Sequence, residues 1–141
     1  MQIHILNRYK AAEWSFRNPN DLVGVISITD SLAPDNKFNI LATDYKVLHL
    51  KFDDIDVQYR DLVLMSVEDA NKIIRFVDAW INMVDYWIVH CEAGISRSAG
   101  VAGALLRIYV GDDRQVFNDY QYAPNRYVYR TIMNQYYNKG E

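Results

Sequence analysis

The segment from His90 to Ser98 holds the residues best suited to chemistry. It reads His-Cys-Glu-Ala-Gly-Ile-Ser-Arg-Ser and contains the only cysteine, Cys91, with five residues between it and Arg97. The apolar run before it, 86–89, predicts a buried strand. The residues after it, 98–109, predict a helix that Gly111 can end. A strand, a tight loop and a helix in this order turn backbone N–H groups toward one point and form an anion-binding cradle.

Four residues of this segment suit phosphoryl transfer. Cys91 is expected at the mouth of the cradle, where the helix dipole favours the thiolate, a strong nucleophile toward phosphorus. The planar guanidinium of Arg97 can hold two phosphoryl oxygens. Gly94 lets the backbone approach the anion closely, and Ser98 can donate its hydroxyl to the departing sulfur. The alternative, a buried structural cysteine, explains neither Arg97 nor Ser98.

The other residues of the segment are expected to support the anion. His90 is predicted to orient the loop rather than to transfer a proton. The side chain of Glu92 is expected to form an outward salt bridge or to restrain the loop, and Ser96 to act as a backbone donor rather than as a second nucleophile. Backbone N–H groups and one side chain then bind phosphate, at Glu92, Ala93, Gly94, Ile95, Ser96 and Arg97.

An acidic segment is the candidate source of a proton. Asp53, Asp54 and Asp56 follow a predicted strand at 46–52. One carboxyl group can protonate the leaving oxygen and later activate water. Loops at the carboxyl ends of parallel strands share one crevice, so this segment and Cys91 are expected to meet. A solvated acidic turn is the structural alternative for all three aspartates.

The string from His90 to Ala99 resembles the signature of the cysteine-dependent protein tyrosine phosphatase superfamily. It is most similar to the compact dual-specificity branch, including bacterial and phage members, and the resemblance extends from about Val25 to Tyr137. It implies a mainly parallel sheet of four or five strands flanked by helices, and metal-independent hydrolysis of phosphate monoesters. It also implies that Asp54 is the general acid, with Asp53 second and Asp56 third.

Composition agrees with one globular α/β domain over residues 1–141. The chain is 50% hydrophobic and 23% charged, with a net charge of −3. The absence of a basic run argues against a nucleic-acid partner. A single cysteine excludes an internal disulfide and fits a cytoplasmic location. The sequence has no signal-peptide pattern and no apolar run of the roughly 20 residues that a membrane-spanning helix needs. His4 and His49 lack metal-ligand spacing, so neither a metal nor a cofactor is expected.

Strand-like and helix-like segments alternate, which is typical of a parallel sheet covered by helices. Strands are predicted at 2–6, 22–28, 46–52 and 86–89. Helices are predicted at 11–16, from a capping box at Ser66 and Asp69 through about Val84, at 98–109, from Asp112 or Asp113 to Tyr122, and from Pro124 to about Asn138. The polar stretch 35–44 is a further candidate for a short helix. Asn125 and Arg126 are interpreted as a helix start and a solvated charge rather than as site residues.

Two classes of function are compatible with these residues. The first is a phosphatase that acts on phosphotyrosine, and also on phosphoserine and phosphothreonine, in protein substrates. The second is a module that recognises a phosphorylated partner without turnover; binding-only relatives usually lose the cysteine or the arginine, and this chain has both. Family resemblance also allows a phosphoinositide or an RNA 5′ phosphate as substrate, but the acidic charge balance disfavours both.

Overall fold

A four-stranded sheet forms the centre of the computed structural model, which describes residues 1–34, 40 and 42–138. The strands lie in the order β1-β4-β2-β3 and every pairing is parallel. They span β1 Ile3–Asn7, β2 Val23–Thr29, β3 Tyr45–Lys51 and β4 Tyr86–Cys91. The expected α/β fold with a parallel sheet of four or five strands is therefore confirmed, and each predicted strand lies within two residues of its observed bounds.

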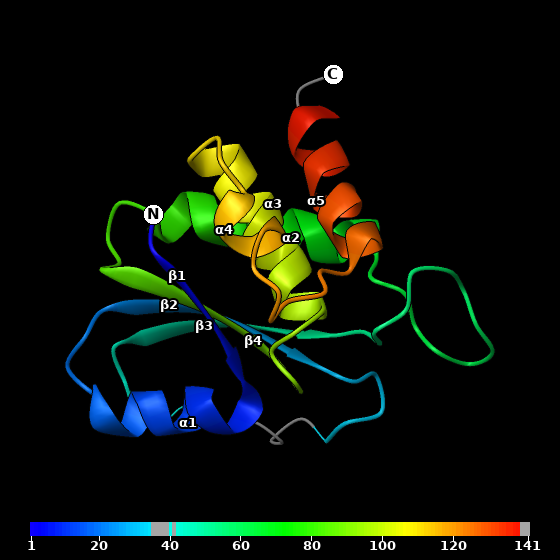
Figure 1. Cartoon of the computed structure of the whole chain (residues 1–141). Helices are drawn as coiled ribbons and strands as arrows, with labels where there is room; N and C mark the ends of the chain where they lie inside the picture. The colour runs from blue at the N-terminus through cyan, green and yellow to red at the C-terminus, as the bar shows by residue number, and fades with distance from the viewer. Residues whose placement is uncertain (35–39, 41, 139–141) are drawn as a thin grey trace.

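Helices cover both faces of the sheet, which is why the inner strands are apolar on both sides. Helix α1 (Arg8–Arg17) lies on one face, and α2 (Val67–Trp80), α3 (Arg97–Tyr109), α4 (Arg114–Phe117) and α5 (Arg126–Asn138) lie on the other (Figure 1). Every residue of β2 is buried. Val23 and Val25 pack in the cluster that contains α1, whereas Ile26 and Ile28 pack in the cluster of the other helices. This alternation follows from the two-residue period of a strand.

Two predicted helix boundaries are confirmed in detail. The Oγ of Ser66 accepts from the Asp69 N–H at 3.0 Å, and the Ser66 N–H donates back to the Asp69 carboxylate at 2.9 Å, which completes the predicted capping box. Gly111 has a φ of 85° and donates its N–H to the carbonyls of Leu106 and Arg107, so it ends α3 as predicted.

Other predicted boundaries are wrong. α1 begins at Arg8 rather than 11, because the Asn7 side chain at the end of β1 accepts from the Lys10 N–H and caps the helix. α2 ends at Trp80, before Val84. α4 ends at Phe117, well before Tyr122, although it begins at Arg114 directly after the two predicted capping aspartates. Of these two, Asp112 accepts from the Arg114 N–H at 3.0 Å, whereas Asp113 accepts from the Tyr129 hydroxyl. α5 begins at Arg126, two residues after the predicted start at Pro124. Most of the short helix predicted within 35–44 lies outside the described residues.

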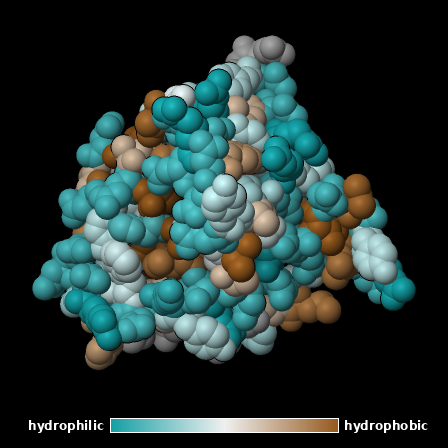
Figure 2. All heavy atoms as spheres, in the orientation of Figure 1, coloured by the Kyte–Doolittle hydropathy of each residue, from teal (hydrophilic) through white to brown (hydrophobic). Residues whose placement is uncertain are grey.

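Most of the molecular face seen in Figure 2 is hydrophilic. Brown side chains gather at its right-hand edge, where the connection from β3 to α2 lies in Figure 1. The exposed large apolar residues of this connection include Val57, Leu62 and Val63.

Within the part of the chain that the structure describes, no helix is both long enough and apolar enough to cross a membrane.

Gly100 allows α3 to pack closely against the start of α5. A Cβ at Gly100 would lie 2.6 Å from the Asn125 carbonyl oxygen, whereas one at Gly103 would meet a Phe117 ring carbon at 3.0 Å. Alanine gains about 0.5–1 kcal/mol over glycine inside a helix, but overpacking costs about 1–3 kcal/mol.

The backbone of Asn125 can shift less readily than the Phe117 side chain can. We therefore expect Gly100→Ala to lower the free energy of unfolding by about 1–2 kcal/mol, and by more than Gly103→Ala does. Urea denaturation checks this, and a Gly100→Ala protein as stable as wild type would contradict it.

Candidate active site

The loop of residues 91–97, here called the cysteine loop, joins β4 to α3 at the carboxyl edge of the sheet. Cys91 is the last residue of β4 and pairs with Asn7 at the end of β1. Gly94 has a φ of 71°, and a Cβ there would lie 2.7 Å from the Asn7 nitrogen and from the Leu6 carbonyl carbon. Both the conformation and the close approach therefore require glycine.

The sulfur of Cys91 lies at the base of this loop rather than at its mouth. The residue is only 2% exposed, because it packs in the main core cluster. The Gly94 N–H donates to Sγ at 3.3 Å, and the Ser98 Oγ lies 3.1 Å from it. The Gly94 N–H therefore points at the sulfur, and the Ser98 contact is the one that the sequence predicts.

The peptide groups of the cysteine loop have a consistent orientation. The carbonyls of Glu92, Ile95 and Ser96 accept hydrogen bonds from the backbone N–H groups of neighbouring segments, at Arg8, Ala123 and Asn125 respectively. In a trans peptide the N–H points opposite to the carbonyl. The N–H groups of Ala93, Ser96 and Arg97 therefore point away from those segments, and an anion cradle requires N–H groups that neighbouring backbone does not occupy.

Arg97 begins α3 and its side chain is buried, at 5% exposure. Its Nη1 donates to the Phe52 carbonyl and pairs with the Asp30 carboxylate, both at 2.8 Å. Its Nε is buried and has no hydrogen-bond partner among the described residues. A buried donor without an acceptor is costly, and an anion held by the cysteine loop would remove that cost.

His90 and Glu92 support the loop from outside. The His90 ring is hydrogen-bonded to Ser27 through Nε2 at 2.7 Å, and burial lowers the pKa of His90 to about 4. The imidazole is therefore neutral near pH 7, which agrees with an orienting role and not with proton transfer. The Glu92 carboxylate lies 3.7 Å from the Arg8 guanidinium, so it restrains the loop against the start of α1.

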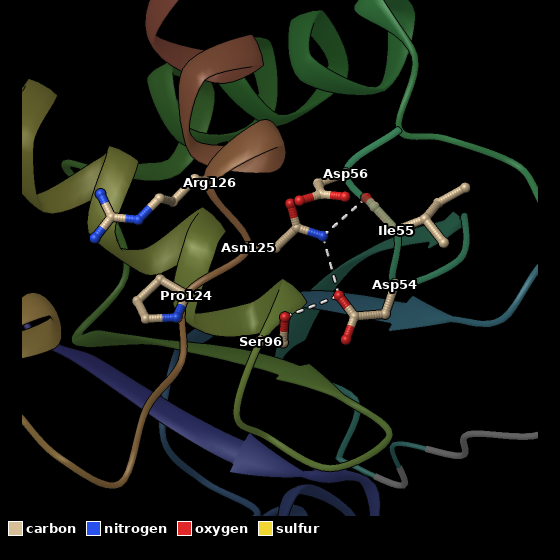
Figure 3. Close-up of a pocket in the computed structure, with 7 residues that line it drawn as sticks. All are labelled: Asp54, Ile55, Asp56, Ser96, Pro124, Asn125 and Arg126. Carbon is tan, nitrogen blue, oxygen red and sulfur yellow. Dashed lines mark hydrogen bonds between the residues drawn. The ribbon is translucent and has the colours of Figure 1, made fainter. Parts of the chain in front are cut away.

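Residues 53–56, here called the acidic loop, lie beside the cysteine loop, and Asp54, Ile55 and Asp56 line a small pocket together with Ser96. The pocket has a volume of about 430 Å³, and Figure 3 shows the residues that line it: Asp54, Ile55, Asp56, Ser96, Pro124, Asn125 and Arg126. The Asp54 Oδ1 accepts from the Ser96 hydroxyl at 2.8 Å and from the Asn125 amide at 3.0 Å. Asp56 is exposed in the same pocket. Asp54 is thus the aspartate that contacts the cysteine loop directly.

Asp53, in contrast to Asp54, is buried and hydrogen-bonded to the protein interior. It is 7% exposed and accepts from the Ser31 N–H, the Ser31 hydroxyl and the Val63 N–H at 3.0, 2.6 and 2.8 Å. Burial alone would raise the pKa of Asp53, but these hydrogen bonds, with a smaller contribution from Arg97, lower it below its usual value. The carboxylate therefore stays ionised, and its oxygens already accept three hydrogen bonds. Asp53 is for these reasons unsuited to proton transfer.

Sequence reasoning missed three residues of the site. Ser27, on β2, holds His90, and Asp30, just after β2, pairs with Arg97. Asn125 reaches Asp54, although the sequence is interpreted above as placing only a helix start there. The one local signal was the polar pair Asn125-Arg126 after Pro124. Across residues 1–34, 40 and 42–138, no group of three or more His, Cys, Asp or Glu side chains could hold a metal ion.

Comparison with solved structures identifies this architecture. The human tyrosine phosphatase-like serine/threonine/tyrosine-interacting protein superposes with a TM-score of 0.69 at 19% identity, over 96% of this chain and 91% of that one. Human DUSP28 superposes with a TM-score of 0.65 at 16% identity, over 94% and 90% of the two chains. The chain has the dual-specificity phosphatase fold. PTPMT1 in complex with PI(5)P shares this dual-specificity phosphatase fold too, with a TM-score of 0.63 at 13% identity over 96% and 90% of the chains.

At these identities the superpositions establish the fold alone. No family model matches the sequence, and a sequence comparison with curated proteins found no match.

The lowered pKa of Asp53 predicts a pH-dependent loss of stability. Its ionised form is favoured in the folded state, so its contribution is present above the unfolded pKa, near 3.8, and is lost as pH falls through the lower folded pKa. Asp53→Asn is expected to lower the free energy of unfolding by about 1–3 kcal/mol at pH 7, and the deficit should shrink below about pH 4. Urea denaturation at pH 7 and pH 3 measures it, with the exposed Asp56→Asn as control. A deficit unchanged at pH 3 would contradict this account.

Proposed function

We propose that this protein is a metal-independent phosphatase, a member of the cysteine-dependent protein tyrosine phosphatase superfamily that hydrolyses phosphate monoesters through a phosphocysteine on Cys91. The observation that carries the proposal is the hydrogen bond between Ser96 of the cysteine loop and Asp54 of the acidic loop. It brings a carboxyl group to the rim of a loop whose base holds the Cys91 sulfur. A nucleophile, an anion cradle and a proton donor are the three parts that this reaction needs.

In the first step the Cys91 thiolate attacks phosphorus, forming the S–P bond while the P–O ester bond breaks. Protonated Asp54 gives its proton to the leaving oxygen, so the alcohol or phenol departs neutral. In the second step water attacks the phosphocysteine and loses a proton to the Asp54 carboxylate. The S–P bond breaks, inorganic phosphate forms, and the Ser98 hydroxyl, 3.1 Å from the sulfur, stabilises the returning thiolate.

Charge on the transferred phosphoryl group is balanced by the loop. The N–H groups of the loop and the free edge of the Arg97 guanidinium contact its non-bridging oxygens in both steps. Because Phe52 and Asp30 already fix Nη1, the arginine needs little rearrangement to bind the anion. Donors held in place before the reaction are the most effective form of transition-state stabilisation.

We further propose a phosphorylated protein side chain as the substrate. Pocket residues Asp54 and Asp56 are exposed at the surface, where a phosphorylated loop or terminus can reach them. Net charge also favours this class, since −3 disfavours approach to anionic lipid surfaces and RNA. The solved complex of PTPMT1 with PI(5)P makes the phosphoinositide the competing substrate class. Phosphate release from phosphotyrosine and phosphothreonine peptides, set against PI(5)P, separates the two.

Hydrolysis of 4-nitrophenyl phosphate with and without EDTA tests the reaction. We expect EDTA-resistant turnover that disappears in Cys91→Ser and falls sharply in Arg97→Lys, because a lysine cannot form the planar two-point contact. Full activity in Cys91→Ser would exclude a cysteine nucleophile. A folded wild type that binds vanadate without any turnover would instead indicate a phospho-recognition module.

Asp54 should set the alkaline side of the pH profile. A general acid must be protonated to act, so kcat/KM of the wild type falls as pH rises, and this limb should vanish in Asp54→Asn. The loss of rate is expected to be about 10²–10⁴-fold for an unactivated aryl phosphate. Asp56→Asn, in the same pocket, is the matched control and should keep most activity. The reverse result, a lost limb in Asp56→Asn only, would make Asp56 the acid.

A further inference from the structure

We infer that Asn125 is a positioning residue for Asp54, an inference that rests on the phosphatase function proposed above. Asn125 lies 71 residues from Asp54 in the sequence and is only 7% exposed. Its Nδ2 donates to the Asp54 Oδ1 and to the Ile55 carbonyl, both at 3.0 Å. One amide group thus holds both the side chain of the acid and the backbone that follows it (Figure 3).

Asn125 is itself fixed on its remaining atoms. Its Oδ1 accepts from the Val128 N–H at 3.1 Å, which caps α5, and its backbone N–H donates to the Ser96 carbonyl at 3.0 Å. Its carbonyl oxygen packs over Gly100 of α3. The residue therefore connects the acidic loop, the cysteine loop and two helices, and it fixes Asp54 relative to the loop that carries the nucleophile.

These contacts also distinguish the two oxygens of Asp54. Oδ1 accepts two hydrogen bonds, from Ser96 and Asn125, whereas Oδ2 accepts none from the described residues. A carboxyl oxygen that already accepts two donors has no room for a proton. The transferred proton is therefore carried on Oδ2, and Asn125 sets the direction in which Oδ2 points.

Asn125 also has a purely structural task, the cap of α5, and the test must separate the two. Serine keeps a cap acceptor for the Val128 N–H but is too short to reach Asp54. Aspartate keeps the cap acceptor and replaces the amide donor with a second carboxylate oxygen facing Asp54. Asn118→Ser makes the same chemical change at an exposed position just after α4, outside the site.

The readout is the dependence of kcat/KM on the leaving group. Dinitrophenolate departs without a proton, whereas the phenolate of phenyl phosphate needs one. For Asn125→Ser we expect a loss of about 10-fold or more on phenyl phosphate, within the range for a displaced general acid, and less than about 3-fold on 2,4-dinitrophenyl phosphate. Asn125→Asp should show the same pattern, and Asn118→Ser no loss on either. In Asp54→Asn, adding Asn125→Ser should cost nothing further on phenyl phosphate, because both changes remove one interaction.

The failures of the two proposals are distinguishable. A wild type without Cys91-dependent turnover overturns the proposed function, and the role of Asn125 with it. An active wild type whose Asn125→Ser variant loses equal activity on both substrates overturns only the positioning role, as does a full additional loss in the double variant. Either of these two results would assign Asn125 to the α5 cap alone.

Discussion

The buried guanidinium of Arg97 is the constraint on which the arrangement of the site depends. A cation removed from water must be compensated by acceptors and an opposite charge. Here the acceptors are the Phe52 carbonyl, just after β3, and the Asp30 carboxylate, just after β2. Arg97 itself begins α3, after β4. One side chain thus ties together the carboxyl ends of three parallel strands, and it fixes where the acidic loop begins relative to the cysteine loop.

Different hydrogen-bond partners give two neighbouring aspartates different environments. β3 ends at Lys51, and the chain then bends at Asp54, where the Ile55 N–H donates to the Asp53 carbonyl at 3.0 Å. Asp53 turns inward, where Ser31 and Val63 donate to it, and Asp54 turns outward, where Ser96 and Asn125 hold it at the pocket. The structural carboxylate anchors the loop, so its neighbour can stay exposed and still be well positioned.

The cysteine loop depends on its surroundings as much as on its own residues. Gly94 provides the required positive φ, and the close approach of β1 leaves no space for a Cβ there. The outward carbonyls are held by Arg8, Ala123 and Asn125, which come from opposite ends of the chain. For the phosphatase proposed above, these contacts would preorganise an anion cradle, because neighbouring segments satisfy three of the loop carbonyls and leave the N–H groups of the same peptides to a ligand.

Local pattern by itself determined the four strands, the capped start of α2, the glycine end of α3 and the residues of the cysteine loop, because hydrophobic periodicity, caps and turn chemistry act over a few residues. It failed at the start of α1, where the Asn7 cap lies in a strand, and at the end of α4, which stops at Phe117 rather than near Tyr122. The family resemblance ranked Asp54 ahead of Asp53 and Asp56, but only the tertiary structure gave Asp54 its contacts with Ser96 and Asn125. It alone gave Arg97 its partner Asp30 and brought Asn125 to Asp54. Each of those contacts joins residues that are 42 to 71 positions apart in the sequence. Local periodicity does not encode which distant groups the folded sheet brings together.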